Sequence, residues 1–417
     1  LPLNDHLASD ILKMRHSARS DRSVSIALLP VRTKPAQSQP ATALPMTAPP
    51  VPLPTTPDHR LARIEAARRA VMNDEPLTAP AMEPWIERSW RRCLASGQRP
   101  EQRVGFDVVS SHVLRRTLES NRNLIDAARP VLQTLGRAIA NTRYFAILTN
   151  ASGVVVDVNG PIDRSDRRAN MITLVGVDLS EASVGTTAIG AALVELQPVW
   201  LHRGEHFFAD TSVYSCAGAP LFGPDGLCVG MLDLTGIEAV ERPELRHMVV
   251  QSARSIENAL TLRQPHSLLV RLNWPGGAMG EDSDGMICLD GDGWVTGANP
   301  TARQMVSQLG VSGRERVHAS ELFALPFEML FDASDQANNA MELPLWSGLR
   351  LQARAQRPGH QIAGAPAQDR IPLKEVEIAL IHKAVADAKG NVQQAARALG
   401  ISRATVYRKL GTGRTAR

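Results

Sequence analysis

The side chains best suited to contacting another molecule gather near the C-terminal end of the chain. Arg403 begins an expected helix over residues 403–410. The same helix carries four further polar or basic side chains: Thr405, Tyr407, Arg408 and Lys409. An arginine fork matches the major-groove edge of guanine, whereas dispersed basic and hydroxyl groups bind phosphate oxygens. We therefore expect Arg403 to reach a base of double-stranded DNA and the other four side chains mostly to hold phosphates.

Two preceding helices are expected to position that helix. Residues 373–385 carry apolar side chains at three- and four-residue steps. Asn391 is a good N-cap for a second helix over 392–399, and at this helix start it is also a phosphate candidate. Residues 400–402 then form a tight turn, and Ser402 caps the third helix and belongs to the expected DNA surface. The pattern predicts a helix-turn-helix; the alternative is a plain three-helix end of a domain with a basic surface.

Charge and composition agree with a nucleic-acid-facing end on a globular body. The chain has 417 residues, 43% hydrophobic and 21% charged, which suits two or three ordinary domains. Residues 371–417 hold nine Lys or Arg against three Asp or Glu, whereas the net charge of the whole chain is only +4. The basic excess therefore lies at the C-terminal end. Charge alone does not distinguish a DNA-binding surface from a solvated one, but together with the helix pattern it favours DNA binding.

Several motifs resemble known regulators. Residues 390–410 resemble the Fis-type helix-turn-helix at the end of sigma-54-dependent activators. Upstream motifs resemble the GAF sensor region of the acetoin-catabolism activator family: Ser89-Trp-Arg-Arg-Cys-Leu94, Glu181-Ala-Ser-Val-Gly-Thr-Thr-Ala-Ile-Gly190, Glu205-His-Phe207, Ser215-Cys-Ala-Gly-Ala-Pro220 and Gly230-Met-Leu-Asp-Leu-Thr-Gly236. The resemblance covers about residues 60–265 and 372–411, and it implies a GAF-type ligand pocket and DNA binding. Thr187 departs from it, since Asn is expected there.

A larger departure concerns ATP. Members of that family carry an ATPase domain with a Gly-x-x-x-x-Gly-Lys-Ser/Thr loop, which holds phosphates. This chain has no Gly-Lys pair, and residues 266–370 are too few for such a domain. We therefore expect a regulator that does not hydrolyse ATP and is not an enzyme.

The expected fold is multidomain α+β. Strands are predicted at 144–148, 154–158, 199–202, 217–222 and 227–234, with a Gly223-Pro-Asp-Gly226 turn and a closing helix at 242–262. This helix, antiparallel meander and helix form an α+β sensor, GAF-like by resemblance, over 143–265.

A second sensor is expected to follow. Asn150, Gly153, Val155 and Asn159 recur as Asp290, Gly293, Val295 and Asn299, 140 positions later. The expected strands 285–289 and 294–298 and a helix from Asn299 make residues 266–351 a PAS-like candidate. A calcium loop at 290–293 is disfavoured because the spaced carboxylates are missing. Residues 352–370 read as a linker before the helix-turn-helix domain at 371–417.

The N-terminal part divides in two. Residues 1–57 are rich in proline and are expected to form a disordered tail. Residues 58–142 form a helical region with a long apolar pattern over 108–141, which Pro130 should kink or break.

Five residues are candidates for contacting the small-molecule effector of the sensor: Thr186, Thr187, Glu205, His206 and Cys216. Each has a simpler alternative. Glu205 and His206 could cap a sheet edge, the threonines could cap the following helix, and Cys216 could be a buried, unreactive thiol. No metal site or disulfide framework is expected from the four scattered cysteines, and no cofactor is predicted.

Three functional classes remain open. The first is a cytoplasmic, ligand-responsive regulator that acts as a homodimer on double-stranded DNA, as a repressor or by touching RNA polymerase. The second is a co-regulator that pairs with a full-length ATPase relative. The third is an enzyme on a GAF scaffold, which the scattered cysteines disfavour. No apolar run reaches the ~18 residues of a membrane span, so no membrane partner is expected.

Overall fold

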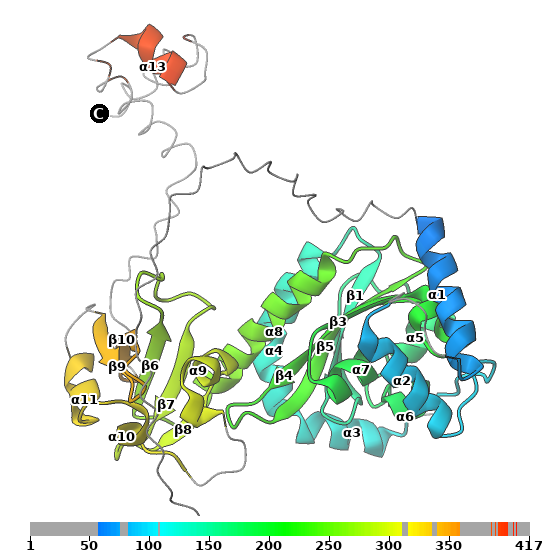
Figure 1. Cartoon of the computed structure of the whole chain (residues 1–417), viewed down its shortest axis with the longest axis horizontal. Coiled ribbons are helices and arrows are strands. Elements are labelled where there is room, and N and C mark those ends of the chain that lie inside the picture. Colours follow the sequence, from blue (N-terminus) through cyan, green and yellow to red (C-terminus); the bar gives the residue numbers. More distant parts are fainter. Residues whose placement is uncertain are drawn as a thin grey trace, which may run out of the picture. The chain divides into compact units, whose positions relative to one another are not determined.

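The computed structural model describes residues 57–75, 82–106, 109–310, 316–335, 340–358 and 391–398, together with Val385, Ala388, Arg403 and Val406 (Figure 1). The expected tail over 1–57 lies outside these residues, except that Pro57 begins a helix.

The described residues of the N-terminal region form four helices. They are α1 (Pro57–Met72), α2 (Pro84–Ala95), α3 (Ser111–Ser120) and α4 (Arg122–Ala138). Helix α3 begins where the Ser110 hydroxyl accepts a hydrogen bond from the amide of Val113, 3.3 Å away.

The expected break of the helix at Pro130 is not found. Helix α4 continues through Pro130, and the helical stretch is divided instead at Asn121, which ends α3 and precedes α4. Proline removes one backbone hydrogen bond, but Leu124, Leu132 and Leu135 on the same helix are buried against the sheet and α8. The packing of that apolar face outweighs the local preference of the proline.

The first sheet contains five antiparallel strands. They are β1 (Tyr144–Asn150), β2 (Val155–Asn159), β3 (Val199–His202), β4 (Tyr214–Phe222) and β5 (Cys228–Ile237). All five expected strands are therefore confirmed, with longer limits for β1, β4 and β5. Their spatial order is β2-β1-β5-β4-β3, so only β3, β4 and β5 form a simple meander, and β1 pairs with the last strand.

Different helices pack on the two faces of this sheet. Helices α4 and α8 (Leu245–Leu262) lie side by side on one face, where Leu232 and Leu234 of β5 point (Figure 1). Short helices cover the other face: α5 (Arg167–Ile172), α6 (Glu181–Val184) and α7 (Ala188–Glu195). Because side chains alternate along a strand, Met231, Asp233 and Thr235 point to this second face.

The second sheet also has five antiparallel strands. They are β6 (Leu268–Asn273), β7 (Gly285–Leu289), β8 (Val295–Ala298), β9 (Met341–Pro344) and β10 (Arg350–Gln356). Three short helices cover its buried face: α9 (Pro300–Met305), α10 (Ala319–Leu322) and α11 (Glu328–Ser334). The α+β class and the strands around the predicted second turn are confirmed.

The expected linker over 352–370 is wrong at its start. Residues up to Gln356 belong to β10, which pairs with β6 and β9. Leu351, Ala353 and Ala355 are buried and alternate with more exposed polar side chains. Buried and exposed residues thus alternate as in a strand. The alternation is hard to see in the sequence, because alanine is only weakly hydrophobic. The rest of the segment, from 359, lies outside the described residues.

The 140-residue repeat is visible in the hydrogen bonds. The Asn150 side chain accepts bonds from the amides of residues 152 and 154, as Asp290 does from 292 and 294. The carbonyls of Gly153 and Gly293, both with positive φ, accept from residues 179 and 319. The weak sequence repeat therefore marks two hairpins built in the same way.

The two sheets have the same spatial order of strands, except that the strand equivalent to β5 comes first along the chain in the second sheet, as β6. The order β8-β7-β6-β10-β9 then matches β2-β1-β5-β4-β3. Ile147 pairs with Asp233 in the first sheet, and Ile287, its counterpart, pairs with Val270 in the second. Val270 therefore occupies the place that Asp233 holds in the first sheet.

The C-terminal segment contains α13 (Val392–Ala398). The Asn391 side chain accepts hydrogen bonds from the amides of Gln393 and Gln394, both at 3.1 Å, so the predicted N-cap is confirmed. Ala396 and Val406 are buried in one cluster, so α13 packs against the part of the chain that carries Val406.

Candidate functional site

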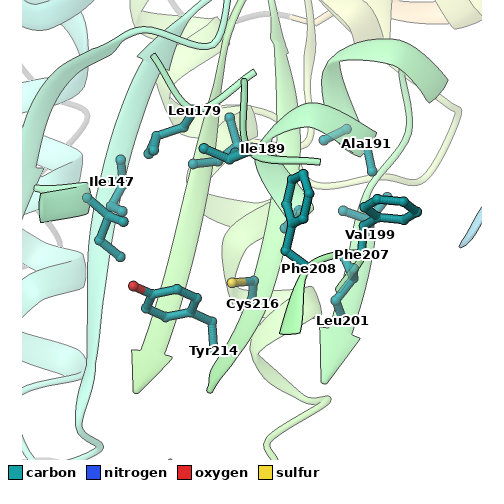
Figure 2. Packing of buried hydrophobic residues seen from close by; sticks show 14 of the residues in the cluster. Ile147, Leu179, Ile189, Ala191, Val199, Leu201, Phe207, Phe208, Tyr214 and Cys216 are labelled. Atoms are coloured by element: carbon teal, nitrogen blue, oxygen red, sulfur yellow. The ribbon is translucent and has the colours of Figure 1, made fainter. Parts of the chain in front are cut away.

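A small cavity lies on the second face of the first sheet, under the short helices. A water-sized sphere can place its centre over about 30 Å³ of this space. Half of the residues that line it are apolar: Phe106, Ile147, Ile172, Leu179, Val184, Ala188 and Ile189. Figure 2 shows Ile147 on β1 and Cys216 on β4, two strands that β5 separates, with Leu179 and Ile189 from segments that cross the sheet. The remaining lining groups are polar: Thr187, His206, Thr211, Tyr214, Cys216, Asp233 and Thr235.

Asp233 is the most unusual of the polar groups. It lies on the central strand β5, between Ile147 of β1 and Gly218 of β4, and is fully buried. One carboxyl oxygen accepts a hydrogen bond from the Thr235 hydroxyl, and the other, Oδ1, has no partner in the part of the chain that the structure describes. Burial raises the pKa of Asp233 to about 7, against the opposing hydrogen bond from Thr235.

His206 also lines the cavity, and it too has a buried side-chain atom without a partner among the described residues. Its Nδ1 lies 2.9 Å from the carbonyl oxygen of Arg203, so Nδ1 carries a proton and donates it. Nε2 is then an acceptor, and it is buried without a partner among the described residues. Burial lowers the pKa of His206 to about 4, so the ring is neutral near pH 7.

Cys216 lines the same cavity without signs of reactivity. Its sulfur lies 3.5 Å from the Thr235 hydroxyl, and the residue is 5% exposed. Burial raises the pKa of the Cys216 thiol well above its ordinary value, with the nearby Asp233 adding to the effect. A protonated thiol is a poor nucleophile, which favours the interpretation of Cys216 as a buried lining residue.

The two threonine candidates differ in position. Thr187 lines the cavity and also caps α7, because its hydroxyl accepts a hydrogen bond from the amide of Gly190 at 3.2 Å. Thr186 is fully buried and bonds instead to α2, with its hydroxyl 2.7 Å from that of Ser89 and 3.6 Å from the sulfur of Cys93.

Glu205 also faces the N-terminal helices. One carboxylate oxygen lies 2.9 Å from the guanidinium of Arg60, and the other accepts from the His202 amide at 2.7 Å. Burial raises the pKa of Glu205, and the Arg60 charge opposes that shift. Glu205 therefore joins α1 to the segment that carries His206, as a structural neighbour of the cavity.

The N-terminal helices hold both segments that border the cavity. Arg68 donates to the carbonyl oxygen of His206 at 2.6 Å, and the Trp90 indole donates to that of Glu205 at 2.9 Å. Arg92 bridges two carboxylates on the other segment, Glu181 at 2.7 Å and Glu195 at 2.8 Å. These bonds give the Ser89–Leu94 motif a physical role, since it fixes α2 to the segments that cross the cavity.

The DNA-facing candidates are described only in part. Asn391 caps α13 and is exposed, and Arg403 is helical and exposed. Both positions suit contact with DNA. The other expected contacts lie outside the described residues: Ser402, Thr405, Tyr407, Arg408 and Lys409.

Sequence reasoning missed Asp233, although the signal was present. Residues 229–237 are apolar, small or hydroxyl-bearing except for this one acid. An acid within such a strand is costly to bury, and buried acids with raised pKa values concentrate at functional sites. Within the described residues, no group of three or more His, Cys, Asp and Glu is arranged to hold a metal ion. No helix in that part of the chain is both long and apolar enough to span a bilayer.

Two family models match the chain. Residues 64–258 match the MimR N-terminal domain, which takes in most of α1, the whole first sheet and most of α8. Residues 372–411 match the bacterial regulatory protein, Fis family.

Relatives with known names are regulators. The chain is 31% identical over 256 residues to the acetoin catabolism regulatory protein of Cupriavidus necator, covering 60% of this chain and 37% of that protein. It is 27% identical over 198 residues to the propane 2-monooxygenase operon transcriptional activator MimR of Mycolicibacterium goodii, covering 47% and 33%. The aligned part therefore spans about a third of the length of these relatives.

Among solved structures, the E. coli DhaR(N)–DhaL complex aligns with 16% identity and a TM-score of 0.41, over 66% of this chain and 100% of that chain. One family model covers the motifs that precede the second sheet in the sequence, and the other covers the motif that follows it. The chain thus combines an N-terminal domain of the MimR type with a C-terminal segment of the bacterial regulatory Fis family.

Proposed function

We propose that this protein is a DNA-binding transcription regulator whose first sheet senses a small molecule. The observation that supports it best is the combination within one chain of a Fis-family segment and a small cavity on the helix-covered face of the first sheet. The first feature is suited to binding DNA, and the second is suited to binding a ligand.

Recognition of DNA is assigned to residues 372–417. Arg403 is exposed in the helical part that packs through Val406 on Ala396 of α13. A recognition helix presents its N-terminal residues to base edges in the major groove, and Arg403 is the first residue of the helix expected over 403–410. Asn391 stands at the start of α13, where backbone amides and the helix dipole favour a phosphate.

The regulator is proposed to act as a homodimer and without hydrolysing ATP. One recognition helix reads too few base pairs to select a promoter, whereas two helices related by a two-fold axis read an inverted repeat. The chain lacks a Gly-Lys pair, and so lacks the lysine that a phosphate-binding loop of the ATPase type requires.

Genome-wide mapping of DNA fragments bound by the tagged protein tests this proposal. The expected result is a small set of sites that share an inverted repeat. A matched chain that lacks residues 372–417 should lose these sites while its first sheet stays folded, as seen by circular dichroism. Retention of the same sites by the shortened chain would refute the assignment.

A further inference from the structure

We propose that the β4–β5 turn, residues 223–226, couples the strands that wall the cavity to the second sheet, and that Arg303 is the positioning residue that fastens the turn there. The second sheet lies between the two segments that match family models, so a change that reaches it has left the first sheet on the way to the Fis-family segment. Because the coupling starts at the cavity, the inference rests on the proposed sensing function.

Strands β4 and β5 form one hairpin that runs from the cavity to the turn. Cys216 of β4 and Thr235 of β5 line the cavity and pair with each other. The pairing continues, with one register shift, to Phe222 and Cys228 beside the turn. Two backbone hydrogen bonds within residues 223–227, at 2.8 and 2.9 Å, close the turn. A hairpin held in this way transmits a shift of its strands from the cavity to its tip.

The tip is fastened to the second sheet through one carbonyl oxygen. The oxygen of Pro224 accepts a hydrogen bond from the amide of Ala298 on β8 at 2.9 Å and another from the guanidinium of Arg303 on α9 at 2.6 Å. Strand β8 is an edge strand of the second sheet, where backbone amides lack a neighbouring strand. The turn of the first sheet therefore supplies the acceptor that this edge needs.

Arg303 joins carbonyl groups from both sheets. Its half-buried guanidinium donates to the carbonyl oxygen of Leu309 and, at 3.3 Å, to that of Ala298, which both belong to the second sheet and its helices. The third acceptor, Pro224, belongs to the first sheet. A partly buried cation is costly unless its hydrogens are bonded, so moving the turn away would leave part of this guanidinium unsatisfied.

Two glycines allow the close approach of the turn. A Cβ at Gly297 of β8 would lie 2.9 Å from the Cβ of Pro224, and a Cβ at Gly226 would lie 3.0 Å from the guanidinium carbon of Arg303. Both distances are shorter than an ordinary contact between carbon atoms. A side chain at Gly297 would therefore push the turn off the edge of the second sheet.

Helix α8 makes a second contact between the sheets. The Asn299 side chain donates to the Asn258 side chain of α8 at 2.7 Å, and both residues are buried. However, α8 packs on the face of the first sheet that lies away from the cavity. The turn ends the strands that wall the cavity, so we assign the coupling to the turn and treat α8 as the alternative.

A double-mutant cycle on the full chain separates the two routes. Ile147 of β1 is fully buried and lines the cavity, so Ile147→Ala destabilises the first sheet. Pulsed hydrogen exchange during urea unfolding gives a midpoint for peptides of β5 and another for peptides of β7. We expect Ile147→Ala to lower both midpoints equally, by about 1 M, because the coupled sheets unfold together. Ile147→Val is the smaller step if Ile147→Ala does not fold.

Arg303→Met removes the bonds to the turn and keeps an apolar stem. In this background, Ile147→Ala should still lower the β5 midpoint, but it should lower the β7 midpoint by at most about a third of that amount. Gly297→Ala should give the same result, because it displaces the turn without removing a hydrogen bond of Arg303 within the second sheet. A purely local role of Arg303 in α9 would lower stability and leave the two midpoints linked.

Matched controls stay inside the second sheet. Arg357→Met removes a guanidinium whose bonds go to Ser334 and Phe331 of α11. Gly291→Ala adds a Cβ whose nearest neighbour, the hydroxyl of Ser267, is 3.7 Å away. In both controls the β7 midpoint should follow the β5 midpoint as it does in the unmodified chain.

Two results would overturn the inference. A β7 midpoint that ignores Ile147→Ala in the otherwise unmodified chain would show that the sheets are not coupled. A β7 midpoint that still follows β5 in Arg303→Met or in Gly297→Ala would assign the coupling to α8. The genome-wide map of bound DNA is read separately: sites found without coupling leave the regulator assignment standing, whereas absence of sites refutes the proposed function whatever the midpoints show.

Discussion

Replacing Asp233 with asparagine should remove a pH dependence from the stability of the first sheet. Burial raises the pKa of Asp233 from 3.8 to about 7 in the folded protein. Between these pH values the folded carboxyl keeps its proton, whereas the unfolded one has lost it. Unfolding therefore releases a proton, and the free energy of unfolding falls as pH rises from about 4 to 7.

The size of this effect follows from the pKa difference. One pKa unit corresponds to about 1.4 kcal/mol, so Asp233 lowers the free energy of unfolding by about 4 kcal/mol at pH 7.5 relative to pH 3.5. Asparagine stays neutral at every pH. The stability of Asp233→Asn relative to the unmodified chain should therefore rise by up to about 4 kcal/mol across this window.

Other groups in the cavity do not disturb the comparison. The titratable side chains that line it with Asp233 are His206, Tyr214 and Cys216. The pKa of His206 is lowered to about 4, so His206 acts with the opposite sign and lowers stability as pH falls below about 6.5. Because His206 is present in both proteins, its contribution largely cancels in the difference.

The assay is urea unfolding of the full chain between pH 4 and 7.5, with hydrogen exchange of peptides from β4 and β5 reporting on the first sheet alone. Glu257→Gln provides a second buried carboxyl, with a pKa raised from 4.5 to about 7, and should show a smaller change of the same sign, about 3 kcal/mol. Equal pH slopes for Asp233→Asn and the unmodified chain would refute the assignment of a buried, proton-holding Asp233.

Further predictions concern the C-terminal segment and the assembly. Asn391→Ala should cost about 1 kcal/mol of helix stability in α13, measured by thermal unfolding of the segment within the chain, because two amides lose their acceptor; no loss would contradict the cap. Arg403→Ala should cost roughly 1–3 kcal/mol of operator binding and relax one base position, whereas Lys409→Ala should weaken all sequences alike and flatten the salt dependence. ATP turnover should stay at background with and without DNA, and turnover abolished by a mutation in this chain would overturn that expectation. Light scattering at micromolar concentration should give a dimer that protects two half-sites about 34 Å apart or a multiple of that, and a monomer on a single half-site would exclude it.

Sequence patterns predicted most of the secondary structure because its signals are local. The Gly-Pro-Asp-Gly turn at 223–226 and the apolar run of β3 need no knowledge of the rest of the chain. The failures have tertiary causes. Pro130 stays inside α4 because the helix is held by its buried face, and β10 was mistaken for a linker because Ala353 and Ala355 carry little hydrophobic signal.

The candidate site was predicted less well, since its members come from separate segments. His206, Thr187 and Cys216 were named from the sequence and do line the cavity. Thr186 and Glu205 are buried neighbours whose bonds go to α2 and α1, and sequence spacing does not distinguish the two sides of a segment. Asp233 lies within a quoted motif, but only the strand pairing puts it on the central strand, on the face of the sheet that His206 also lines.

The position of His206 also gives the ligand a route to the rest of the chain. Its carbonyl oxygen accepts a hydrogen bond from Arg68 of α1, while its ring lines the cavity. A ligand in the cavity would therefore contact the segment that α1 holds from the other side. Such a ligand changes the position of α1 only if its affinity differs between two arrangements of that segment.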